Sequence, residues 1–67
     1  MHFTDLGSFI LIDGTRLRKS SIVQYYSKTC DGGHFVVITI GDASMCFELD
    51  SEESARDLVN DIDEAIT

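Results

Sequence analysis

Four residues of this chain carry side chains that ligate transition metals: His2, Cys30, His34 and Cys46. The stretch CDGGH places Cys30 and His34 on either side of a turn, close enough to share one ion. A structural zinc site takes four ligands, usually as two close pairs. The second pair would be His2 and Cys46, which are distant in sequence and belong to no metal motif. Turn chemistry explains the pattern better, and we expect no metal and no cofactor.

Catalytic signatures are also missing from the sequence. A nucleophilic cysteine needs a neighbouring base, and the pattern places no histidine beside Cys46, which we interpret as a small filler on a packed strand. The stretches DGTRLR and CDGG lack the glycine spacing and the following helix of a phosphate-binding loop. We therefore expect a protein that is not an enzyme.

The charge of the chain is uneven. The net charge is −7, and residues 1–47 hold equal numbers of acidic and basic residues. Residues 48–67 hold eight acids and one base, Arg56, so this segment accounts for the whole net charge. Direct binding to a nucleic-acid backbone needs clustered Lys and Arg, and we expect none. A partner protein with a basic surface is favoured electrostatically.

Acidic residues recur along the predicted C-terminal helix. Asp57, Asp61 and Glu64 have the i, i+4, i+7 spacing of one helix face, and Glu53 extends the acidic surface by one turn. These residues lack the loop spacing of a calcium site. They also lack a cleft for paired-carboxylate catalysis, because the outer face of a helix is convex. Two interpretations remain, namely a solvated face that keeps a small protein soluble and a docking surface for a basic partner. We call this set the acidic helix face: Glu53, Asp57, Asp61 and Glu64.

The basic residues offer a competing hypothesis. Four of them are interleaved with Tyr25 and Tyr26, and such a mixture can bind single-stranded nucleic acid by stacking and charge. The overall negative charge and the small number of bases argue against it. The four bases are Arg16, Arg18, Lys19 and Lys28.

The elements that position these residues are strands followed by one helix. Strand signals cover residues 9–13, 15–18, 22–29, 34–40 and 45–49, separated by the turn stretches DG, KSS, CDGG and GDAS. Residues 51–66 form the helix, capped by Asp50 or Ser51, with Glu53 three residues after Asp50 as in a capping box. This order predicts a single α+β domain over residues 1–67, an antiparallel β-meander of three to five strands with a C-terminal helix packed on one face.

The turns also predict the register. A two-residue turn at Asp31–Gly32 pairs Tyr25 with Ile38, and a turn centred on Asp42–Ala43 pairs Ile38 with Phe47. Both turns assign one set of apolar residues to a single face, which the helix positions 55, 58, 59, 62 and 66 would cover. This predicted core face consists of Ile10, Ile12, Leu17, Val23, Tyr25, Val36, Ile38, Ile40, Met45, Phe47 and Leu49.

The segment Phe35–Ile40 is apolar on both faces of its strand, apart from one threonine, and a single helix covers only one face. A contiguous apolar patch tends to mark an interface, so we expect a second chain, most simply a second copy, on the other face. The alternative is that the N-terminal segment MHFTDLG folds over it. We call this set the outer apolar face: Phe9, Leu11, Tyr26, Phe35, Val37 and Cys46.

The sequence thus predicts a small, acidic, non-enzymatic protein–protein interaction module that acts in the cytoplasm as an inhibitor or regulator. In size and charge alone it is similar to phage-encoded anti-CRISPR and anti-restriction inhibitors, which occupy nucleic-acid-binding grooves. Two alternatives are an accessory subunit of a larger assembly and a single-strand nucleic-acid binder or metal-dependent factor. We expect no signal peptide and no membrane span, because no apolar run is long enough.

Overall fold

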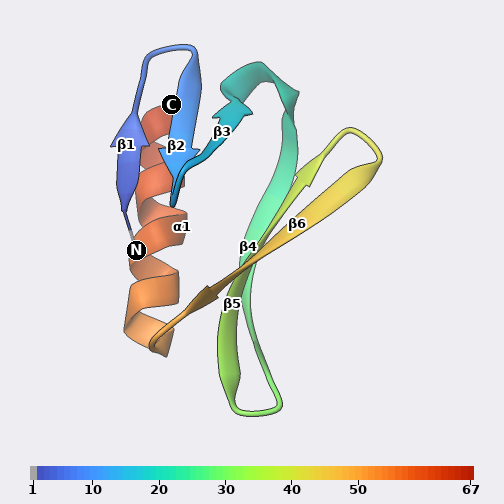
Figure 1. Ribbon diagram of the computed structural model, residues 1–67, viewed down its shortest axis with the longest axis vertical. Helices are drawn as coiled ribbons and strands as arrows, with labels where there is room; N and C mark the ends of the chain where they lie inside the picture. Colours follow the sequence, from blue (N-terminus) through green and yellow to red (C-terminus); the bar gives the residue numbers. More distant parts are fainter. Residues whose placement is uncertain (1) are drawn as a thin grey trace.

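The strands form two antiparallel sheets that share one C-terminal helix (Figure 1). The computed structural model describes residues 2–67, and within them the sheet orders are β1-β2-β3 and β4-β5-β6. The predicted α+β class, the antiparallel meander and the C-terminal helix are confirmed, while the division into two sheets was not predicted. The elements are β1 (Phe3–Asp5), β2 (Phe9–Ile12), β3 (Thr15–Arg18), the 3-10 turn η1 (Lys19–Ser21), β4 (Ile22–Cys30), β5 (Gly33–Ile40), β6 (Ala43–Leu49) and α1 (Glu52–Ile66).

Three two-residue turns connect the hairpins. Asp13–Gly14 and Asp31–Gly32 have positive φ at both residues, as type I′ turns require, with values of 47° and 86° in the first and 51° and 79° in the second. The third turn is Gly41–Asp42, where the positive φ of 60° falls on Gly41 alone, as in a type II′ turn. The predicted centre at Asp42–Ala43 was therefore wrong by one residue.

The shift of the third turn moves the pairing between β5 and β6 by two residues. Ile38 lies opposite Met45, and Val36 lies opposite Phe47. Because side chains alternate with period two, a two-residue shift leaves every side chain on its predicted face. The pairing of Tyr25 with Ile38 across the other hairpin is as predicted.

The first residues of β4 depart from the prediction. A bulge between Ile22 and Gln24 puts Ile22, not Val23, opposite Ile40. Val23 was assigned to the core face, but its side chain is 67% exposed. A bulge inserts one extra residue and reverses the side on which the preceding side chains lie, which explains the error.

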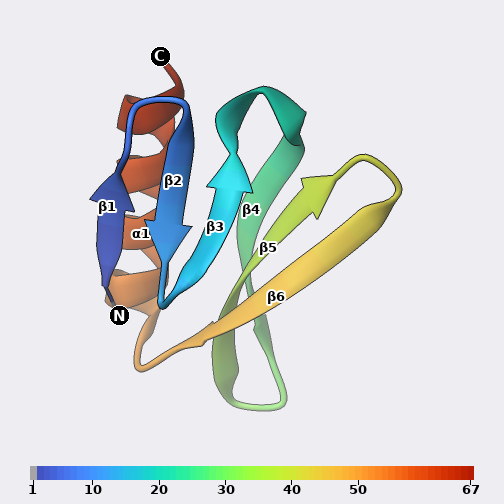
Figure 2. The ribbon, with the colours of Figure 1, turned by 45° about the horizontal axis from the view of Figure 1, so that its top comes forward.

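Both sheets and the helix contribute to one core. Its fully buried members come from β2, β5 and α1. The helix contacts β1, β4, β5 and β6, and Figure 2 shows it behind β1 and β2. Ile66, the last residue of the predicted helix stripe, is 40% exposed because it ends the helix. The buried core consists of Ile10, Ile12, Leu17, Val36, Ile38, Leu49, Ala55, Leu58 and Ile62.

The helix begins with a side-chain cap. Ser51 is the N-cap residue, and its Oγ accepts a hydrogen bond from the backbone N–H of Ser54 at 3.1 Å. The predicted capping box from Asp50 to Glu53 is not the arrangement found. Glu52 and Glu53 occupy the first turn, where the helix dipole favours negative charge.

The N-terminal strand lies at the edge of the first sheet and brings the number of strands within residues 2–67 to six, one more than the three to five predicted. β1 pairs with β2, on the side away from β4–β6 (Figures 1 and 2). The carboxylate of Asp5 accepts hydrogen bonds from the backbone of Gly7 and from Lys19 Nζ at 2.7 Å. These hydrogen bonds lower the pKa of Asp5 below its ordinary value, and the one from Lys19 has the larger effect. Tyr26 is 43% exposed, so the alternative in which this segment hides the outer apolar face is wrong at that residue.

Candidate functional site

The acidic helix face divides into two halves in the structure. Asp57 and Asp61 line a groove between α1 and the ends of several strands, whereas Glu53 and Glu64 lie exposed on the helix outside that lining. The predicted set is therefore not one uniform surface. Two of its four members belong to a concave site, and the other two do not.

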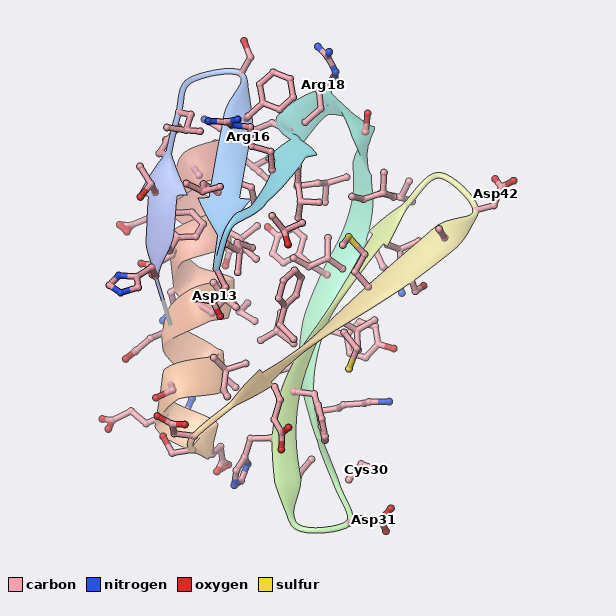
Figure 3. The ribbon with its side chains drawn as sticks, in the orientation of Figure 1. Asp13, Arg16, Arg18, Cys30, Asp31 and Asp42 are labelled. Carbon is pink, nitrogen blue, oxygen red and sulfur yellow. The ribbon has the colours of Figure 1, made fainter. Side chains whose placement is uncertain are left out.

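The groove has a volume of about 620 Å³ and is formed by four parts of the chain. These are the start of β1, the turn between β2 and β3, the end of β6 and one side of α1. Asp13, at the lower end of the first sheet in Figure 3, marks the turn. We call this site the acidic groove; its lining residues are His2, Phe3, Asp13, Glu48, Leu49, Asp50, Ser54, Asp57, Leu58 and Asp61.

Negative charge dominates the acidic groove. Five of its lining residues carry carboxylates, and none is Lys or Arg. Asp13 Oδ1 accepts a hydrogen bond from the backbone N–H of His2 at 2.9 Å, and the backbone N–H of Asp13 donates to the carbonyl of His2 at 3.0 Å. This pair of bonds holds the chain start against the turn and fixes one wall of the groove.

The groove is not polar throughout. Leu49 and Leu58 are buried core residues that reach its lining, and Phe3 is half-buried beside them. Lys and Arg side chains pack their aliphatic stems on apolar surface while their charged ends stay near carboxylates. A floor of this kind under a rim of carboxylates therefore suits basic side chains better than a small apolar ligand.

Sequence reasoning missed three carboxylates of the groove. Asp13 was interpreted as a turn residue and Asp50 as a helix cap, and Glu48 was counted in the net charge of residues 48–67. Each assignment followed from local context. The excess of acids over bases in residues 48–67, which includes Glu48 and Asp50, was visible as net charge. No local pattern places Asp13 in the same groove as Asp57.

The residues considered for metal binding do not assemble. Within residues 2–67, no group of three or more His, Cys, Asp or Glu side chains is arranged to hold a metal ion. Cys30 and Cys46 are both free and exposed. Cys30 lies at the tip of the β4–β5 hairpin beside Asp31 (Figure 3), while His34 Nδ1 lies 3.5 Å from Thr29 Oγ1.

The outer apolar face is split between the two sheets. Tyr26, Val37 and Cys46 form one row across β4, β5 and β6, and Phe35 shares their strand face two residues from Val37. Phe9 and Leu11 lie on β2, in the other sheet, and both are half-buried. The six residues therefore form two patches on different sheets.

Val37 is only 7% exposed although no helix covers its side of the sheet. Its cross-strand neighbours Tyr26 and Cys46 flank it. The ring of Phe35 lies over Gly33, where a Cβ would meet it at 2.9 Å. Neighbouring side chains within the sheet thus cover Val37, while Tyr26 and Cys46 of the outer apolar face stay exposed.

The basic residues are dispersed. The guanidinium of Arg18 lies 4.8 Å from the centroid of the Phe9 ring, a cation–π contact across β2 and β3. Lys19 pairs with Asp5, and Arg56 approaches Glu52 at 3.9 Å along the helix. Arg16 and Arg18 lie in the first sheet and beside η1 (Figure 3). No basic groove with stacked tyrosines is formed by them.

Tyr25 is engaged by the helix. Its hydroxyl donates a hydrogen bond to the carboxylate of Asp63. That hydrogen bond, followed by desolvation, raises the pKa of Tyr25 above its ordinary value. Tyr25 and Tyr26 point to opposite faces of β4, which prevents them from stacking on the same strand of nucleic acid.

The Tyr25–Asp63 contact predicts a change at alkaline pH. Because the folded-state pKa of Tyr25 is raised, the contact contributes to stability below the unfolded-state pKa of about 10. That contribution is lost as pH rises through the folded-state pKa. We expect the Asp63→Asn variant to form phenolate at lower pH than the wild type, measured by near-ultraviolet absorbance. Coincident titration curves would show that the hydrogen bond is not made in solution.

No helix within residues 2–67 is both long enough and apolar enough to cross a membrane. Comparisons of the chain with protein-family models, with curated proteins and with solved structures gave no match.

Proposed function

We propose that this protein is a non-enzymatic binding module that receives basic side chains of a partner protein in its acidic groove. The observation that carries the proposal is a groove of about 620 Å³ with five carboxylates and no Lys or Arg in its lining. An acidic concave site repels phosphate and attracts Lys and Arg. The partner surface is therefore basic, and the protein acts by covering it.

Basic surfaces of this kind include those with which proteins bind nucleic acid. Occupation of such a surface by an acidic protein excludes the nucleic acid, because both compete for the same Lys and Arg residues. This supports an inhibitor or regulator, the role that the size and charge of the chain suggest. The free cysteines Cys30 and Cys46 suit a reducing compartment such as the cytoplasm.

The test is calorimetric titration of the purified protein with a short arginine-rich peptide, repeated over a range of salt concentrations. We expect binding at low salt that weakens as salt rises, because the attraction between exposed charges is screened. A glutamate-rich peptide of equal length is the control and should not bind. Absence of arginine-peptide binding at low salt would contradict the proposal.

Self-association remains a separate prediction. The exposed ring of Tyr26 is compatible with a homodimer through the outer apolar face, but the near-complete burial of Val37 reduces the apolar surface that such a contact would gain.

A further inference from the structure

We infer that the free edge of β6 pairs antiparallel with β6 of a second copy, and that this pairing joins two three-stranded sheets into one of six strands. β6 is the last strand of its sheet, and its partner is β5 alone. A strand at an edge presents a row of unpaired backbone N–H and C=O groups that another strand can complete.

β6 differs from the other edges of the described sheets. β1 and β3 are short, with three and four residues. β3 also carries Arg16 and Arg18, and β4 has a bulge at its start and Lys28 near its end. Short length, charge and bulges are the devices that block pairing at an edge. β6 has seven residues, pairs regularly with β5 and carries one charge, Glu48.

The turn before β6 decides which backbone groups are free. Ile40 and Ala43 flank a two-residue turn, so they exchange backbone hydrogen bonds. Along an antiparallel strand the bonding direction alternates from residue to residue. The N–H and C=O groups of Ser44, Cys46 and Glu48 therefore point to the free edge.

These three residues select one register for a second copy. Full overlap of two β6 strands with the free groups facing each other puts a twofold axis at Cys46. Ser44 then lies opposite Glu48 of the second copy, which avoids like charges within the strands. Met45 lies opposite Phe47 of the second copy. Both are half-buried on the core side of the sheet, and this pairing covers their exposed parts.

Like charges that oppose association lie at the ends of the paired strands. In this register Asp42, which projects from the β5–β6 turn (Figure 3), lies opposite Asp50 of the second copy. Both copies are also strongly acidic. We therefore expect dimerisation to strengthen as salt rises. Binding of an arginine-rich peptide should weaken over the same range, so failure of either proposal is seen separately from failure of the other.

Exposed Ser44 allows a matched test by sedimentation equilibrium. Ser44→Glu places Glu opposite Glu48 at two symmetric positions, and the dimer should weaken by about fivefold, while Ser44→Lys should strengthen it by a similar factor. The double variant Ser44→Glu with Glu48→Lys should restore association. Circular dichroism checks that each variant is folded. A monomeric wild type at high micromolar concentration and moderate salt, or equal association of the Glu and Lys variants, would overturn the proposal.

Two controls locate the contact. With oxidised glutathione, the Cys30→Ser variant should form a covalent dimer through Cys46, and two glutathione thiols are released per disulfide. A disulfide can form there because paired residues at a hydrogen-bonded position have Cα atoms about 5.5 Å apart, within disulfide range. The Cys46→Ser variant lacks this thiol and should form no covalent dimer. The Tyr26→Ser variant, which removes the exposed ring without changing the charge, should leave association unchanged. Its loss in that variant would assign the dimer to the outer apolar face and overturn pairing at the edge.

Discussion

Replacement of Ile62 by alanine should lower the free energy of unfolding by about 3 kcal/mol, since large-to-small changes at buried positions remove transfer free energy and leave a cavity. Ile62 is 0% exposed and lies on the side of α1 that packs against both sheets. A domain of this length has a total stability of only about 3–10 kcal/mol. The variant should therefore be partly unfolded at moderate temperature, which urea denaturation followed by circular dichroism would measure.

Ile66→Ala is the matched control for this change. The residue type, the helix and the substitution are the same, but Ile66 is 40% exposed at the end of α1. We expect a loss of less than about 1 kcal/mol, as for exposed positions. Equal losses at the two positions would mean that the helix stripe is buried to its end and that α1 packs differently from the arrangement described.

The second large effect concerns binding. The double variant Asp57→Lys with Asp61→Lys should bind an arginine-rich peptide at least about tenfold more weakly at low salt, because two attractive contacts become repulsive. Both residues line the acidic groove and are exposed. Lysine is a better helix former than aspartate, so α1 should be retained. Calorimetric titration measures the affinity.

Glu53→Lys with Glu64→Lys is the control for net charge. These residues lie on the same helix but outside the lining of the groove, and the change in total charge is identical. We expect a much smaller loss of affinity. If both double variants lose affinity equally, net charge and not the groove attracts the peptide. If neither loses affinity, the acidic groove is not the binding site.

Local signals in the sequence were sufficient for most of the elements. The Asp-Gly pairs at Asp13 and Asp31 specify type I′ turns, because a positive φ at consecutive residues is tolerated by few other pairs. The apolar spacing from Ala55 to Ile62 specifies a helix with one buried side. These signals act over a few residues and depend little on the rest of the chain.

The points at which prediction was wrong depend on longer-range packing. The bulge at Val23 has no distinctive residue type, since it arises where the chain leaves η1 and enters the second sheet. The turn at Gly41–Asp42 has one glycine and two plausible centres, and packing on the core does not distinguish registers that differ by two residues. Strand β1 is too short to show a periodic pattern.

By itself, the sequence determined the class of fold, the faces of most strands, the capped helix and the concentration of negative charge near the C-terminus. Only the tertiary structure decided that Asp13, Glu48 and Asp57 border one groove, and that Val37 is covered by its own sheet. The physical reason is range: turn conformation and side-chain alternation are set by neighbouring residues. The position of three carboxylates, distant in sequence, around one groove depends instead on how two sheets pack against one helix.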